Sequence, residues 1–145
     1  QPTPEAPPGD EAPAGPIPSE ESARRLSDEA VLEGLAHERA GRWEDARAAY
    51  DRALVAFAQN PHALAGLARE RLAAEDAQAA LRFAERASSF RRRRAEYRVL
   101  IGDAHRMAGD EAAARAEYEA ALELDPNDAP ALARLGRAAA PQPAP

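Results

Sequence analysis

Residues 31–54 read VLEGLAHERAGRWEDARAAYDRAL, and residues 99–122, which lie 68 positions later, read VLIGDAHRMAGDEAAARAEYEAAL. The two stretches are identical at 13 of 24 positions. Alanine richness accounts for some of these matches, but not for paired glycines, histidines and tyrosines in one register. The pairs are Gly34 with Gly102, His37 with His105, Gly41 with Gly109, and Tyr50 with Tyr118. This self-similarity indicates a protein built from repeated structural units.

The middle of the chain matches both stretches at a spacing of 34 residues, which is half of the 68-residue shift. The repeat period is therefore 34 residues. Ala80 lies midway between Ala46 and Ala114, and Ala87 lies midway between Ala53 and Ala121. The first unit therefore spans 27–60, the second 61–94 and the third 95–128, and 129–140 resembles a further first helix. A terminal helix of this kind is expected to cap the apolar face of the last unit.

Each unit has the pattern of two helices joined by a tight turn. In the third unit, a helix from about Glu96 ends at Ala108, and Gly109 suits the left-handed conformation that closes a helix. Asp110 and Glu111 then place negative charge at the start of the next helix, where the helix dipole favours it.

The starts of the first helices carry capping residues. Asn60 is a good N-cap for a helix in which Pro61 takes the first position. Ser27 is the predicted N-cap of the first unit, with Leu26 and Val31 placed as a hydrophobic staple.

The mid-helix glycines, Gly34 and Gly102, each cost about 1 kcal/mol relative to alanine, so a packing reason is expected. A position without a side chain lets the second helix of the same unit approach closely. We expect Tyr50 and Tyr118 to be the large side chains that fill these contacts, among the small faces of Ala46, Ala53, Ala114 and Ala121.

The composition agrees with an all-α chain. The sequence has 39 alanines, 19 arginines, no lysine and no cysteine, and alanine is the strongest helix former. Absent cysteine excludes disulfides and thiolate sites. Arginine in place of lysine is typical of a high-GC bacterial coding bias. No apolar run approaches the roughly 18 residues of a transmembrane segment.

The N-terminal region differs from the rest. Residues 1–18 hold seven of the 13 prolines, and residues 1–22 carry five acids and no base. We interpret 1–22 as a disordered, acidic, Pro-rich tail or linker, 23–140 as the folded domain and 141–145 as a second short Pro-rich tail. Without residues 1–22 the chain has 20 acids and 19 arginines, and such a near-neutral body does not predict nucleic-acid binding.

The pattern resembles the tetratricopeptide repeat (TPR), a 34-residue helix–turn–helix unit. The third unit carries the fullest signature, which is Gly102, Gly109, Ala114, Tyr118, Ala121, Leu122 and Pro126. The first unit has Gly34, Gly41, Trp43, Ala46, Tyr50, Ala53 and Leu54, with Ala58 in place of the closing proline. The middle unit departs from the pattern, with Glu75 for the turn glycine, Ala84 for the aromatic residue and Arg92 for the proline. These departures leave its turn and its exit geometry open.

The resemblance implies an all-α solenoid whose first helices line a concave groove that binds a protein or peptide. The groove positions that it implies are Val31, Leu35, Glu38, Ala65, Arg69, Leu72, Val99, Asp103 and Arg106. Chaperone-binding relatives carry a basic and amide carboxylate clamp at such positions, but here Val31, Leu35, Ala65 and Val99 replace most of it. An acidic C-terminus is therefore not the expected ligand. We expect an apolar patch rimmed by charges of both signs, exposed rather than buried between the units.

A second candidate surface is the run Arg91, Arg92, Arg93 and Arg94. Four cations could hold a phosphate group or an acidic partner segment. The alternative, which we favour, is that these arginines cap the preceding helix and pair with Glu85 and Glu96.

No catalytic or cofactor motif is present. The serines have no neighbouring histidine, and His37 and His105 are expected about 20 Å apart, too far to share a metal ion. The sequence thus predicts a non-catalytic interaction adaptor without metal or cofactor. A structural or self-associating module of a larger assembly remains the alternative. Because the chain begins with Gln1, a removed signal peptide with a periplasmic location and an upstream domain with a cytoplasmic one stay about equally open.

Overall fold

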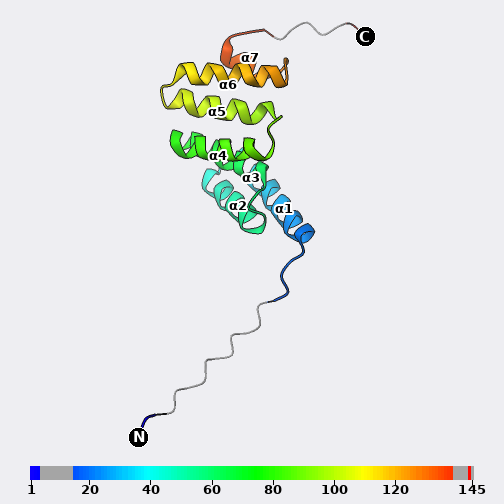
Figure 1. Cartoon of the computed structure of the whole chain (residues 1–145), viewed down its shortest axis with the longest axis vertical. Coiled ribbons are helices and arrows are strands. Elements are labelled where there is room, and N and C mark those ends of the chain that lie inside the picture. Colours follow the sequence, from blue (N-terminus) through cyan, green and yellow to red (C-terminus); the bar gives the residue numbers. More distant parts are fainter. Residues whose placement is uncertain (4–14, 139–143, 145) are drawn as a thin grey trace.

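The computed structural model describes residues 1–3, 15–138 and 144, and within them every regular element is an α-helix. The helices are α1 (Glu20–Arg39), α2 (Trp43–Ala56), α3 (Pro61–Ala73), α4 (Ala77–Phe90), α5 (Ala95–Met107), α6 (Glu111–Leu124) and α7 (Ala129–Leu135). Figure 1 shows them stacked in chain order along one axis. The predicted all-α solenoid of three helix–turn–helix units with a C-terminal helix is confirmed. Residues 4–14, half of the predicted disordered tail 1–22, lie outside the described residues. Residues 20–22 belong to α1, so the folded domain starts before the predicted boundary at residue 23.

The helices form two layers. The first helices contact one another, α1 with α3, α3 with α5 and α5 with α7. Among the described residues, the second helices α2, α4 and α6 contact only the helices before and after them in the chain. The first helices α1, α3, α5 and α7 therefore form one layer, and the second helices form the other. We call the side of the first-helix layer that faces away from the second helices the groove face.

The first helix starts earlier than predicted. Ser19, not Ser27, is the N-cap of α1, and its hydroxyl accepts a hydrogen bond from the backbone N–H of Ser22 at 3.2 Å. The prediction for Ser27 is wrong because Glu20 and Glu21 already provide the acidic first turn that stabilises a helix start.

Ser27 instead connects three helices. Its buried hydroxyl donates to the carbonyl of Ala53 at the end of α2 (2.8 Å) and accepts from Asn60 Nδ2 (2.9 Å). Asn60 also caps α3, as predicted, because its Oδ1 accepts from the N–H groups of His62 and Ala63. A predicted cap residue is thus a buried link between α1, α2 and α3.

The three turns share one backbone conformation. Gly41 and Gly109 have φ values of 72° and 87°, as the left-handed helix closures predicted. Glu75 takes the same conformation in the middle unit, with φ of 58°. The middle turn therefore keeps its geometry without glycine, although a side chain in this region costs about 1–2 kcal/mol.

The predicted glycine–tyrosine contacts are present. A Cβ atom added at Gly34 would lie 2.5 Å from Tyr50 Cε1, and one added at Gly102 would lie 2.5 Å from Tyr118 Cε1. Tyr50 also contacts Gly66 of the next unit, so its ring is enclosed between two glycines. Both rings are fully buried beside the alanines of the second helices.

The middle unit builds its core with a different residue. Ala68 and Ala84 stand where the other units have glycine and tyrosine, and Tyr97 of α5 lies with them in one buried cluster. Tyr97 is fully buried, and its hydroxyl has no hydrogen-bond partner among the described residues.

The last helix is shorter than the predicted 129–140. Gly136 takes a left-handed φ of 66° and ends α7 after Leu135. Ala131 packs into the cluster of Val99 and Tyr118, as expected for a helix that caps the last unit. Residues 139 and 140 lie outside the described part.

Candidate binding groove

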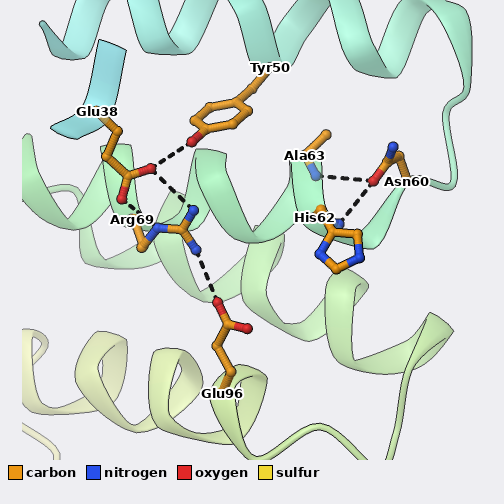
Figure 2. A network of polar contacts seen from close by, with 7 residues as sticks. All are labelled: Glu38, Tyr50, Asn60, His62, Ala63, Arg69 and Glu96. Atoms are coloured by element: carbon orange, nitrogen blue, oxygen red, sulfur yellow. Dashed lines mark hydrogen bonds and ion pairs between the residues drawn. The ribbon is translucent and has the colours of Figure 1, made fainter. Parts of the chain in front are cut away.

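A network of charged side chains crosses the groove face of the first units (Figure 2). Arg69 of α3 holds the Glu38 carboxylate of α1 with two hydrogen bonds, from Nε at 2.6 Å and from Nη2 at 3.1 Å. The Tyr50 hydroxyl donates to the same carboxylate at 2.6 Å. Arg69 Nη1 reaches Glu96 of α5 at 3.3 Å. The network thus joins α1, α2, α3 and α5.

The last unit repeats this arrangement with other residues. Asp103 of α5 accepts from the Tyr118 hydroxyl at 2.7 Å and from Arg134 Nε and Nη2 of α7 at 2.8 and 3.0 Å. Glu38 precedes Arg69 by 31 residues, and Asp103 precedes Arg134 by 31 residues. In both places a tyrosine hydroxyl and a guanidinium fork together satisfy one carboxylate.

These contacts shift the pKa of the groups involved. Burial raises the pKa of Tyr50 and Tyr118 most, and the neighbouring carboxylate raises it further. Burial lowers the pKa of Arg69, but the hydrogen bond and the charge of Glu38 outweigh this, and the net pKa is raised. The tyrosines therefore stay protonated and the arginine stays charged at neutral pH.

A pocket of about 440 Å³ opens beside these pairs, between α3, α5 and α7. Its apolar lining comes from Trp43, Leu72, Ala73, Val99, Leu100 and Pro130, and its polar lining from Arg69, Glu96, Asp103, Asp128 and Arg134. We call it the groove pocket. Four of the predicted groove residues line it, namely Arg69, Leu72, Val99 and Asp103.

The predicted exposure of the apolar groove positions is wrong. Val31, Ala65 and Val99 are 7%, 1% and 5% exposed and belong to the three core clusters. They face the neighbouring first helix, which lies close enough to cover them. Only half-buried Leu35 and Leu72 leave part of an apolar side chain accessible.

The predicted groove residues also do not form one continuous site. Val31 and Leu35 line a separate pocket of about 470 Å³, together with Leu32, Phe57, His62 and Arg91. Arg106 lies over the Tyr118 ring, 4.9 Å from its centroid, and donates to the backbone carbonyl of Arg134. Glu38 and Asp103 are occupied by arginines within the chain, so they do not form a free charged rim.

The arginine run lies in the exposed loop between α4 and α5. Among the described residues none of Arg91, Arg92, Arg93 and Arg94 forms an ion pair, and the predicted pairing with Glu85 and Glu96 is absent. Glu96 pairs with Arg69 instead. Only the backbone of Arg91 serves as the C-cap of α4.

Sequence reasoning missed several residues of the groove pocket. The repeat pattern assigns Trp43 only to the motif of its unit, Asp128 only to the end of the third unit, and Pro130 and Arg134 only to the capping helix. The signal available for Arg134 was its 31-residue spacing from an acid, the same as that of Arg69 from Glu38.

The described residues hold neither a membrane-spanning helix nor a cluster of metal ligands. None of their helices is long and apolar enough to cross a membrane. They contain no group of three or more histidine and acidic side chains that could hold a metal ion.

Comparisons with solved structures find the same fold at low sequence identity. The first TPR domain of human RPAP3 is 20% identical, with a TM-score of 0.74 over 78% of this chain and 89% of that one. The first TPR of Spaghetti (RPAP3) bound to the HSP90 peptide SRMEEVD is 20% identical, with a TM-score of 0.73 over 78% and 90%. The Sgt2 TPR domain from Aspergillus fumigatus is 24% identical, with a TM-score of 0.71 over 76% and 74%.

Sequence comparison gives a more local result. No curated protein matches the chain significantly. The tetratricopeptide repeat family matches residues 94–138, which hold α5, α6 and α7. The resemblance noted from the motif residues is thus confirmed by the tetratricopeptide repeat match over residues 94–138, and the three units together share the fold of solved TPR domains.

Proposed function

We propose that this chain is a non-catalytic interaction adaptor that binds an apolar or amphipathic segment of a partner protein on its groove face. The observation that carries the proposal is the groove pocket. Its volume of about 440 Å³ falls within the usual range of ligand pockets, about 300–1,000 Å³. Its lining combines six apolar residues with five charged ones, so it can take up an apolar side chain and orient it through polar contacts.

The structural neighbours support peptide binding as the kind of function. The Spaghetti (RPAP3) domain holds a chaperone peptide that ends in EEVD. The ligand proposed here differs from that peptide, because Val31, Ala65 and Val99 are buried and apolar at the positions of a basic clamp. The accessible groove offers Leu72 and the groove pocket instead.

The test is capture of a partner by three purified forms of the chain. Leu72→Glu places a charge at the accessible apolar lining and should abolish capture, while the unchanged chain retains it. Leu26→Glu is the matched control, because Leu26 lies on α1, is 49% exposed and lines none of the pockets described above. Equal capture by Leu72→Glu and Leu26→Glu would show that the partner uses another surface.

The arginine loop is proposed as a secondary contact rather than as the main site. Its four exposed cations would attract an acidic part of the same partner and act mainly on the association rate. Changing Arg91, Arg92, Arg93 and Arg94 to serine should weaken capture modestly at low salt and hardly at all at high salt. Complete loss at both salt concentrations would make the loop the main site.

Self-association is the second candidate. Leu32 and Val55 are the large apolar side chains of α1 and α2 with the highest exposed fractions, 67% and 89%. Sedimentation over a wide concentration range tests this candidate, since a dimer that disappears in Leu32→Ser or Val55→Ser would favour it. A monomer at all concentrations would exclude it.

A further inference from the structure

The charges around the groove pocket do not cancel. Four carboxylates, Glu38, Glu96, Asp103 and Asp128, face two guanidinium groups, Arg69 and Arg134, in the pocket and its adjoining network. The sum is four negative and two positive charges, a net of −2. A local excess of negative charge attracts cationic segments and repels acidic ones.

The two arginines are already occupied. Arg69 binds Glu38 through Nε and Nη2, and Arg134 binds Asp103 through the same two nitrogens. Planar two-point pairs of this kind are among the stronger charged contacts in proteins. Neither arginine is therefore a ready receptor for a partner's carboxylate.

The remaining negative charge lies on Glu96 and Asp128. The Glu96 side chain is 53% exposed, and its contact with Arg69 Nη1 is the longer of that arginine's ion pairs, at 3.3 Å. Asp128 uses Oδ2 to cap α7 through the N–H of Ala131 at 2.9 Å, and no donor among the described residues contacts its Oδ1. Both carboxylates line the pocket and retain acceptor capacity.

The aromatic ring in the pocket agrees with this charge. Tryptophan is the side chain that binds cations best through its ring face. The described arginines that stack on rings lie over Phe57 and Tyr118, and none lies over Trp43. Trp43 is half-buried and lines the pocket, where its ring can contact a cation that a partner brings.

From these observations we infer that the groove pocket takes a cationic amphipathic segment, one whose apolar side chain enters between Leu72 and Pro130 while an adjacent lysine or arginine meets Glu96, Asp128 and Trp43. This inference rests on the proposed groove function and names its ligand class. This ligand is positively charged, whereas the peptide held by the Spaghetti (RPAP3) domain ends in the acidic sequence EEVD.

The experiment uses two synthetic peptides of equal length, with the same central leucines flanked by lysines in one and by glutamates in the other. Trp43 is the single tryptophan of the chain and lines the pocket, so its fluorescence reports binding there. Anisotropy of dye-labelled peptides gives the affinity independently. Both titrations are made with the full chain at low and at high salt.

The lysine peptide should bind at least about tenfold more tightly than the glutamate peptide at low salt, and the difference should shrink at high salt. Glu96→Gln and Asp128→Asn should each weaken the lysine peptide about two- to fivefold. Asparagine keeps the N-cap of α7, so Asp128→Asn preserves the fold. Glu123→Gln, an exposed acid of α6 outside the pocket, is the matched control and should change nothing.

Each other outcome has a definite meaning. Equal binding of both peptides, lost in Leu72→Glu, would overturn the charge preference and leave the groove function standing. Weakening by Glu123→Gln as large as that by Glu96→Gln would overturn the assignment to the pocket, because net charge alone would then explain the preference. Failure of both peptides to bind or to change Trp43 fluorescence would overturn the inference and count against the groove function as well.

Discussion

The outer units and the middle unit of this solenoid reach the same backbone with different side chains. In the first and third units a tyrosine of the second helix packs on a glycine of the first, and its hydroxyl bonds to a groove carboxylate. In the middle unit alanines replace both residues, and Tyr97 from the following unit occupies the same buried cluster. The volume of one aromatic ring is therefore supplied either from within a unit or from its neighbour.

The two solutions differ in what they do with the hydroxyl group. Tyr50 and Tyr118 connect the core to the charged network of the groove face, whereas the hydroxyl of Tyr97 has no described partner. The motif tyrosines of the outer units thus couple packing to the groove, whereas Tyr97 only packs. The same contrast extends to the turns, where glycine stands at the outer two and Glu75 at the middle one.

The largest expected effect tests whether Tyr97 really replaces the missing motif tyrosine. Tyr97→Ala and Tyr118→Ala should each lower the free energy of unfolding by about 3–5 kcal/mol, because both leave a cavity where a fully buried ring was. Chemical denaturation of both variants measures this. Phe90→Ala, at a partly exposed ring, is the control and should cost clearly less. A small loss for Tyr97→Ala alone would break the proposed equivalence.

Removing only the hydroxyl should separate the two kinds of unit. Tyr118→Phe should lower stability by about 1.5–3 kcal/mol, since the charged carboxylate of Asp103 loses the hydrogen bond that the Tyr118 hydroxyl donates to it. Tyr97→Phe should leave stability unchanged or raise it by about 1 kcal/mol, because a buried hydroxyl without a partner is removed. Losses of the same size in both variants, measured by denaturation, would show that Tyr97 has a partner after all.

The turns should respond in opposite directions. Glu75→Gly should stabilise the chain by about 1 kcal/mol, because glycine adopts the left-handed conformation without strain, and Gly109→Ala should destabilise it by about the same amount. Ala74→Gly is the control, because Ala74 has a negative φ and gains nothing from glycine. A melting temperature of Glu75→Gly below that of the unchanged chain would contradict the strain at this turn.

The smallest expected effect is at alkaline pH. The pKa of Tyr50 and Tyr118 is raised in the folded state, so above the ordinary tyrosine pKa of about 10 the unfolded chain releases protons that the folded chain keeps. Stability from these residues is complete below about pH 10 and falls as the pH rises further. The melting temperature should decline by a few degrees towards pH 11, and less in the Tyr50→Phe/Tyr118→Phe variant. An equal decline in both chains would assign the effect to other groups.

Local pattern was sufficient for much of the fold. The period of the matching residues predicted three helix pairs, Gly41 and Gly109 predicted two of the turns, and Asn60 with Pro61 predicted the start of α3. These features depend on residues within a few positions of one another, where backbone preference decides. Ser27 shows the limit, because an equally good cap, Ser19, lies eight residues earlier.

The groove could be predicted only in outline. Helical spacing placed Arg69, Leu72, Val99 and Asp103 on one face, and the structure brings these four to one pocket. The same spacing also placed Val31, Ala65 and Val99 there as exposed side chains, although neighbouring helices cover all three. Spacing along one helix gives the direction of a side chain but not the distance to the next helix.

The sequence by itself therefore determined the repeat period, the helical class, the turns and the contacts of Tyr50 and Tyr118 with glycines, since each follows from local preference or from an internal match. The tertiary structure alone decided which groove side chains are buried, that Arg69 and Arg134 are occupied by Glu38 and Asp103, and that Tyr97 fills the middle core. The two arginine pairs join residues 31 positions apart in chain order, and all of these outcomes depend on how closely successive units stack.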